Sequence, residues 1–398
     1  MATVPSLIVI SCVRGHHAPV TATPTATPAP AAVAPTAPTT PAAGRDRYLD
    51  ALRAAAIVRV VIFHMFGVAW LSYAYPAMGV MFALGGSLMA RSIQRSARQA
   101  VTSRIRRLLP ALWVLGAVMV PVMRWHGWPG QGDRLDLLLW VVPLADPPGS
   151  AWATEATEVL WYLVTYLWLV LLSPLAWRAY RQWPVPTLLA PLAVLVALVT
   201  TDGRLGPVEL AGRVGDVVTD VATFGACWVL GFAHRTGALR RVNRPLLLAL
   251  AADCLVAGAA WALTHPADDA GYDLNDIPLA QALYSLGFVL IVLRAGPPMG
   301  WLARIRPLDR LVTLLNSRAV TIYLWHNVAI AVSFPVGDLL GVWRLGQAVE
   351  IGYFAIALLG LAVVVLAVGW VEDLSAGRRP RLLGVCRRAG VPGSGGRR

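Results

Sequence analysis

Charged side chains are scarce in this 398-residue sequence, and lysine is missing from it altogether. Only 14% of the residues are charged and 57% are hydrophobic, whereas soluble domains usually carry about 25% charged residues. Because charges are costly in hydrocarbon, this shortage excludes an ordinary soluble protein and favours one whose solvent is lipid. All 34 basic residues are arginines, and the formal net charge is +13. The arginines stand between apolar stretches, so we interpret them as topology signals and expect no nucleic-acid partner.

The sequence also lacks the usual signatures of a metal or nucleotide site. Its four cysteines are scattered and form no Cys-x-x-Cys pair. No His or Cys spacing resembles a zinc site, and no glycine-rich phosphate loop follows a strand. We therefore expect no metal ion and no bound cofactor.

The two ends of the chain differ in composition from the region between them. Residues 18–43 consist almost wholly of Thr, Ala, Pro and Val, a composition that cannot bury a core. We therefore predict a disordered cytoplasmic leader at 1–44, a membrane domain at 45–373 and a basic cytoplasmic tail at 374–398.

Long apolar runs fill the region from Tyr48 onward. A helix needs about 20 residues to cross a hydrocarbon core, and lipid allows only helices or closed barrels to span it. These runs are too long and too continuously apolar for alternating barrel strands. The sequence therefore predicts an all-α, polytopic transmembrane bundle of about ten spans: 49–72, 76–91, 108–125, 158–177, 185–201, 217–234, 245–264, 278–294, 319–335 and 349–371.

Arginines gather in every second loop between these runs. The basic loops are those around 91–107, 178–181, 235–244 and 304–318, and the loops around 133–146 and 268–276 are acidic. Cytoplasmic loops carry the excess of arginine in membrane proteins. We therefore predict a multi-pass protein of the cell membrane with both termini in the cytoplasm.

Ionisable residues inside the first run are candidates for function, because such groups are expensive in a membrane. Arg53 and His64 are eleven residues apart, which places them on one helix face about 16 Å apart along the axis. Arg59 points elsewhere, and we assign it no role beyond structure. Two alternatives stay open: Arg53 as an anchor at the helix end, and His64 as a hydrogen-bonding group between helices.

A second intramembrane histidine, His326, and a basic segment complete the candidates. His326 is either a link between helices or part of a polar cavity shared with Arg53 and His64. Arg104 and Arg107 are three residues apart at the start of a helix and can share a face. They are either a positive-inside cluster or a phosphate-binding pair. Asp253, in the seventh run, is a candidate partner for an arginine.

These residues give the chain a resemblance to a known family. From residue 46 to about 371 it resembles the acyltransferase-3 family of membrane-bound O-acyltransferases. Four motifs carry the resemblance in the same order: the Arg-x10-His pair at Arg53 and His64, the glycine-rich second run at 79–90, the basic loop leading to Pro110 at 104–110, and the Tyr-Leu-x-His stretch ending at His326. The segment at 160–174 also resembles the family's fourth-span region.

The resemblance implies a set of roles for these residues. His64 would be the base for an acceptor hydroxyl or a transient acyl carrier. Arg53, with Arg104 and Arg107, would hold the phosphates of acyl-CoA or polarise its thioester, and His326 would line the same cavity. The acceptor would be a hydroxyl of a carbohydrate or glycosylated compound, and the acyl group most simply an acetyl group.

The chain departs from the family pattern at two places. Many relatives have Ser-Gly where Gly85 and Gly86 stand, and a Glu where Tyr166 stands. The carboxylate that assists His64 is therefore unassigned, with Glu158 as one candidate. A transporter or flippase remains the alternative function, since buried His and Arg are also common there. A purely structural or sensing protein is a third.

Overall fold

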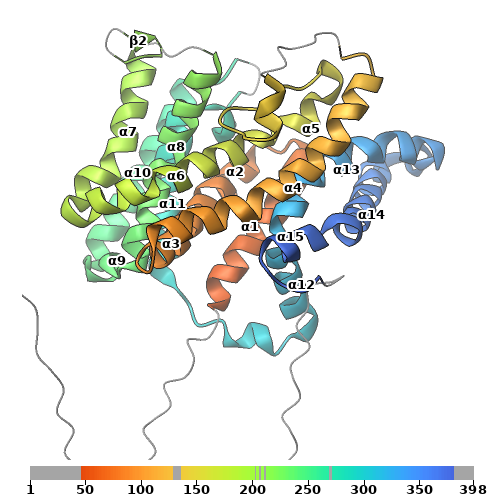
Figure 1. Cartoon of the computed structure of the whole chain (residues 1–398). Helices are drawn as coiled ribbons and strands as arrows, with labels where there is room; N and C mark the ends of the chain where they lie inside the picture. The colour runs from red at the N-terminus through yellow and green to blue at the C-terminus, as the bar shows by residue number, and fades with distance from the viewer. Residues whose placement is uncertain are drawn as a thin grey trace, which may run out of the picture. The chain divides into compact units, whose positions relative to one another are not determined.

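A computed structural model of the chain describes 46–128, 136–201, 203–205, 208–209, 212–268 and 271–380. The predicted leader at 1–44 and the tail beyond residue 380 lie outside these described residues. Helices dominate the described part, which confirms the predicted all-α fold (Figure 1). Two antiparallel strands of two residues each, β1 (Arg204–Leu205) and β2 (Val208–Glu209), are a small exception in this part.

The described helices fall into long and short ones. The long helices are α1 (Arg47–Phe66), α3 (Ala77–Ile93), α4 (Ala97–Trp125), α6 (Leu160–Gln182), α7 (Pro184–Thr200), α8 (Gly212–Arg235), α10 (Arg244–Thr264), α11 (Pro278–Ala295), α13 (Ala319–Leu339) and α14 (Val349–Val368). The shorter ones are α2 (Trp70–Ala74), α5 (Thr154–Glu158), α9 (Ala238–Arg241), α12 (Arg306–Ser317) and α15 (Trp370–Ser375). Five 3-10 turns join them: η1 (Asp136–Trp140), η2 (Ala151–Ala153), η3 (Leu274–Asp276), η4 (Gly300–Ala303) and η5 (Val342–Ala348).

Seven helical segments of the described chain are long and apolar enough to cross a membrane. They are α4, α6, α8, α10, α11, α13 and the segment Val342–Val368, which includes α14. Each of the ten predicted runs overlaps one of the long helices, but α1, α3 and α7 are not among the seven. In α1 the reason is charge, because Asp50, Arg53 and Arg59 lie within it. The number of ten spans therefore stays a prediction.

Two of the predicted runs are interrupted. The first run, predicted at 49–72, ends as a helix at Phe66, where Gly67 adopts a left-handed conformation with φ 61° and donates its N–H to the Phe63 carbonyl. Glycine takes this conformation without steric cost, which is why it ends helices. The last run, predicted at 349–371, stops as a helix at Val368, and α15 begins at Trp370 after the single residue Gly369. The break at Gly369 separates α15 from α14, and α15 contributes to the candidate site.

Helix α3 packs very closely against α8 through the glycine-rich motif. A Cβ atom on Gly86 would overlap the backbone carbonyl of Trp228, and one on Gly231 would overlap the carbonyl of Ala83. Small residues allow helix backbones to approach in this way. Gly86 of the second run and Gly231 of α8 thus form the closest part of this contact.

Helix α1 lies between two hydrophobic clusters. Ala56 and Val60 pack into a cluster built mainly on α3, α6, α8 and α11. Ile57 and Val61 pack into a second cluster built mainly on α4, α6, α13 and α14. The side chain of Tyr323 contacts both clusters. Residues of α1 and α13 are therefore held at the junction of the two halves of the bundle (Figure 1).

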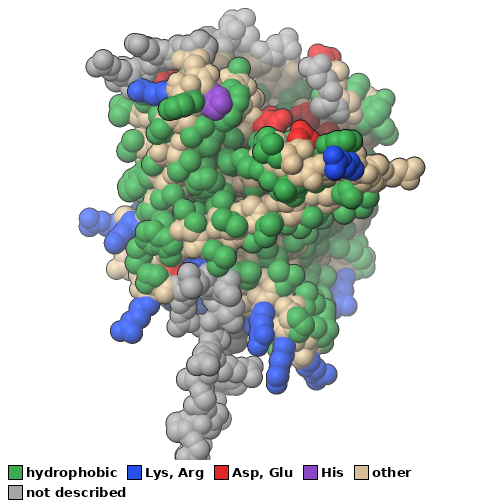
Figure 2. Space-filling model, turned by 90° about the vertical axis from the view of Figure 1, so that its right-hand side faces the viewer, with side chains coloured by type: hydrophobic (Ala, Val, Ile, Leu, Met, Phe, Trp, Pro, Cys, Tyr) green, Lys and Arg blue, Asp and Glu red, His purple; other side chains and the backbone are tan. Residues whose placement is uncertain are grey.

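Charge is distributed unevenly between the two ends of the bundle. On the face in Figure 2, arginines gather mainly at the lower end and carboxylates at the upper end. The start of α1 and the segment after α15 lie at the same end of the bundle, because Arg53 and Arg378 line one cavity. The side of the membrane that this end faces is a prediction from arginine content, which favours the cytoplasm.

Candidate active site

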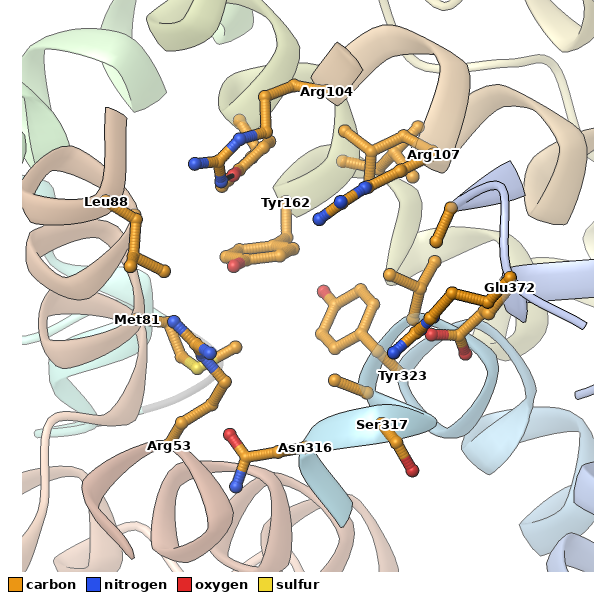
Figure 3. Close-up of a pocket in the computed structure, with 18 residues that line it drawn as sticks. Arg53, Met81, Leu88, Arg104, Arg107, Tyr162, Asn316, Ser317, Tyr323 and Glu372 are labelled. Atoms are coloured by element: carbon orange, nitrogen blue, oxygen red, sulfur yellow. Dashed lines mark hydrogen bonds between the residues drawn. The ribbon is translucent and has the colours of Figure 1, made fainter. Parts of the chain in front are cut away.

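A cavity of about 240 Å³ opens at the junction of the two clusters. Helices α1, α3, α4, α6, α12, α13 and α15 contribute to its wall. Figure 3 shows Arg53 reaching into the space from one side and Arg104 and Arg107 from the other, with Tyr162 between them. The structure therefore brings together the three arginines that the sequence analysis selected.

Three of the arginines that line the cavity have no carboxylate within ion-pair distance among the described residues. Within the described ranges, no ion pair involves Arg53, Arg104 or Arg107, and the Nη1 of Arg104 donates a hydrogen bond to the Tyr166 hydroxyl at 3.1 Å. One carboxylate, Glu372, lines the cavity. An excess of guanidinium groups around a cavity is suited to an anionic ligand, above all to phosphate.

Arg104 and Arg107 are held by a regular helix and not by a loop. The predicted basic loop at 104–110 is part of α4, which starts after Ser96 and continues through Pro110. The hydroxyl of Ser96 accepts a hydrogen bond from the Gln99 N–H, which caps the helix start. The segment is therefore not a loop, and the placement of Arg104 and Arg107 at the start of a helix agrees with the structure, because the polar residues extend the helix of the following apolar run. The expectation that the two arginines share a helix face agrees with their place in one cavity wall.

Three tyrosines connect the cavity with the neighbouring site. The rings of Tyr162 and Tyr166 are 6.1 Å apart, and those of Tyr162 and Tyr323 are 4.7 Å apart. The Tyr323 hydroxyl donates a hydrogen bond to the Val159 carbonyl at 2.8 Å. The ring of Tyr323 also lies 5.6 Å from that of His326. The sequence places Tyr323 in the Tyr-Leu-x-His motif, but the motif alone did not predict that this side chain belongs to the site.

His64 and His326 contact each other directly. Their ring centroids are 4.8 Å apart at an interplanar angle of 80°. The Nδ1 of His64 is 2.9 Å from the Val60 carbonyl, and that of His326 is 2.6 Å from the Tyr323 carbonyl. Since a carbonyl oxygen only accepts, both Nδ1 atoms carry the proton, and a neutral ring then has a lone pair on Nε2.

The two histidines differ in accessibility. His64 is exposed near the end of α1, whereas His326 is 1% exposed and its Nε2 has no hydrogen-bond partner in the described structure. Neither ring is among the residues that line the arginine cavity. The five predicted residues therefore form two groups, an arginine cavity and a histidine pair, rather than one shared cavity. Tyr323 touches both groups.

Arg59 is buried inside the bundle, as expected for a charged residue deep in an apolar run. Its side chain is 7% exposed, its Nε donates to the Leu71 carbonyl at 3.4 Å, and its guanidinium lies 4.5 Å from the centre of the Phe63 ring. The edge of Phe63 in turn contacts His64, with ring centres 5.4 Å apart. These contacts place Arg59 beside the histidine pair and not in the arginine cavity.

The carboxylates proposed as partners lie elsewhere. Glu158 ends α5 with an exposed side chain, and Asp253 is exposed on α10 with no ion pair inside the described ranges. Neither shows a contact with His64. In the acidic loop before α5, burial and the charge of Asp216 raise the pKa of the Asp146 carboxyl to about 6.

Helix α15 closes one wall of the cavity through a buried ion pair. Arg318 is 0% exposed, and its Nη2 lies 2.8 Å from the Oδ2 of Asp373, while its Nη1 donates to the Gly369 carbonyl at 2.7 Å. The Glu372 carboxylate accepts the Thr321 N–H at 2.7 Å at the start of α13. Burial raises the pKa of the Glu372 carboxyl, and the hydrogen bonds from Thr321 oppose that rise.

The described residues contain no group of three or more His, Cys, Asp or Glu side chains arranged to hold a metal ion. The arrangement offers instead a cavity lined by guanidinium groups and, beside it, two histidine rings in contact.

Comparison with known sequences places the chain in a family. A family model described as an acyltransferase domain matches residues 46–371. No curated protein and no solved structure matched the chain. The match covers almost all of the described structure, including the arginine cavity and both histidines. With its apolar helices, the chain is a multi-pass membrane acyltransferase. The chain belongs to the acyltransferase-3 family.

Proposed function

We propose that the protein transfers an acyl group, most simply an acetyl group, from acyl-CoA to a hydroxyl of a carbohydrate or glycosylated acceptor. One observation carries the choice of donor: Arg53, Arg104 and Arg107 line one cavity without a carboxylate partner among the described residues. Coenzyme A carries a diphosphate and a ribose phosphate, and guanidinium groups bind phosphate through paired hydrogen bonds.

The histidine pair supplies the group that chemistry at a hydroxyl needs. In the direct route, the Nε2 of His64 takes the proton of the acceptor hydroxyl while its oxygen attacks the thioester carbonyl. The carbon–sulfur bond then breaks, and the coenzyme A thiolate leaves and takes up a proton. In the two-step route, Nε2 itself attacks the thioester carbonyl and the coenzyme A thiolate leaves and takes up a proton. The acceptor oxygen then attacks the acyl carbon, loses its proton and displaces the imidazole ring. Both routes produce an ester and free coenzyme A.

His64 suits this role better than His326 because its ring is accessible. His326 is buried, and its backbone hydrogen bond fixes its orientation beside His64. We assign His326 to orienting the His64 ring and stabilising charge on it. Along the helix axis, Arg53 and His64 are about 16 Å apart, so the donor's phosphates and its thioester would occupy different levels of the bundle.

The donor assignment is tested by binding of acetyl-CoA to the purified protein in phosphatidylcholine nanodiscs. Arg104→Ala is compared with Arg106→Ala, a matched control on the same helix whose exposed side chain does not line the cavity. We expect Arg104→Ala to weaken binding roughly tenfold to a hundredfold, the range for lost charge-assisted hydrogen bonds, and Arg106→Ala to change it less than threefold. Equal effects of the two variants would contradict a donor site in this cavity.

A further inference from the structure

A fourth arginine, Arg378, lines the same cavity as Arg53, Arg104 and Arg107. It lies seven residues beyond the end of the family match at residue 371. The sequence analysis placed it in the predicted basic tail that starts at residue 374. The structure brings it back to the cavity wall.

The segment that carries Arg378 is fixed to the bundle by several contacts. After α15, Gly377 adopts a left-handed conformation with φ 67°, and the Arg378 N–H donates to the Asp373 carbonyl at 2.8 Å. The Arg378 guanidinium lies 3.4 Å from the Oδ1 of Asp373, whose other oxygen is held by the buried Arg318. Arg378 is therefore placed by the same ion pair that anchors α15.

The four arginines occupy different depths of the cavity. Arg53 and Arg104 are half-buried, whereas Arg107 and Arg378 are exposed. Arg107 and Arg378 lie on opposite elements, α4 and the segment after α15, and are close enough for their charges to repel each other. Two exposed guanidinium groups that line one cavity and repel each other are suited to a dianionic phosphate, which relieves their repulsion.

We propose that Arg378 is a donor-binding residue and that, with Arg107, it holds the phosphate on the ribose of coenzyme A. This inference rests on the proposed function, in which the donor is acyl-CoA. The half-buried Arg53 and Arg104 are then left for the diphosphate and the acyl arm. The nucleotide end of the donor occupies the mouth of the cavity, and the thioester end points inward.

The test compares two ligands that differ only in this phosphate. Binding of coenzyme A and of 3′-dephospho-coenzyme A is measured by calorimetry with the full chain in nanodiscs of phosphatidylcholine alone, so that no anionic lipid headgroup competes. The variants are Arg378→Ala, Arg378→Lys and the matched control Arg379→Ala, which removes the adjacent exposed arginine outside the cavity wall.

For the wild type we expect about tenfold tighter binding of coenzyme A than of the dephospho ligand, the usual effect of one charge-assisted phosphate contact. Arg378→Ala should lose most of this preference and bind the dephospho ligand as the wild type does, which also shows that the variant is folded. Arg378→Lys should keep part of the preference, and Arg379→Ala all of it.

Two outcomes overturn the inference in different ways. If the wild type prefers coenzyme A and Arg378→Ala keeps that preference, Arg378 does not hold the ribose phosphate, and the proposed function is untouched. If the wild type binds neither ligand, the donor assignment itself fails, and the role of Arg378 fails with it. An equal loss of affinity for both ligands in Arg378→Ala also contradicts the inference.

Discussion

Replacing Asp373 by Asn should weaken both the fold and the cavity wall. Asp373 is 4% exposed, and its Oδ2 lies 2.8 Å from the Nη2 of Arg318, whose side chain is fully buried. The replacement removes the carboxylate that lies within ion-pair distance of this buried guanidinium. Removing one partner of a buried ion pair typically costs about 3–5 kcal/mol of the free energy of unfolding. Because Asp373 also contacts Arg378, donor affinity should fall as well.

The assay is unfolding of the purified protein in mixed detergent micelles, followed by tryptophan fluorescence. Glu350→Gln, an exposed carboxylate at the start of α14, is the control and should change the free energy of unfolding by less than about 0.5 kcal/mol. The double variant Arg318→Met with Asp373→Leu removes both charges of the pair and should be more stable than Asp373→Asn, since neither member is left without the other.

Two results would refute this reasoning. Asp373→Asn with the stability of the control would show that the ion pair does not anchor α15. If the double variant is less stable than Asp373→Asn, the loss of stability comes from changed packing around these two side chains and not from breaking the ion pair.

Three further changes have expected outcomes. Gly86→Ala should lower the free energy of unfolding by about 1–3 kcal/mol, because the added Cβ would overlap a backbone carbonyl of α8. Gly300→Ala, where the Cβ would enter open space, should not lower it, and thermal unfolding of the two variants makes the comparison. Tyr166→Glu would place a carboxylate beside Arg104 and should lower the affinity for acetyl-CoA about tenfold, whereas Tyr166→Phe should change it less. Equal affinities of the Glu and Phe variants for acetyl-CoA would contradict this prediction. The pKa of Asp146 in the folded protein, about 6, lies above its ordinary value, so the folded state binds this proton more tightly than the unfolded state does. The protonated carboxyl therefore stabilises the fold below about pH 4, and this contribution is lost as the pH rises through 6. The free energy of unfolding should fall by at most about 3 kcal/mol between pH 4 and 8 on this account, and Asp146→Asn should remove that fall.

Hydropathy located the helices well because lipid forces each spanning segment to satisfy its own backbone. It missed the breaks at Gly67 and Gly369, since a glycine inside an apolar run has the same hydropathy whether or not the helix ends there. The family motif describes 104–110 as a loop, whereas the spacing of Arg104 and Arg107 indicated the start of a helix, which is what the structure has.

The site was predictable in part. Helix periodicity placed Arg53 and His64 on one face, and charge spacing paired Arg104 with Arg107. The distance between His64 and His326 was not predictable, because it depends on how α1 packs against α13. The place of Arg378 depends on the buried pair of Arg318 and Asp373, 55 residues apart in the sequence. Such long-range contacts have no periodic signature.

The central claim is that His64 carries out acyl transfer from acyl-CoA, and inverted membrane vesicles that contain the protein test it most directly. The vesicles receive radiolabelled acetyl-CoA, and both free coenzyme A and label in the glycan, lipid and protein fractions are followed. His64→Ala is compared with His265→Ala, which alters an exposed histidine stacked on Trp261 at the end of α10. We predict label transfer and coenzyme A release in the wild type and in His265→Ala, and their loss in His64→Ala. Transfer at the wild-type rate in correctly folded His64→Ala protein would contradict the claim.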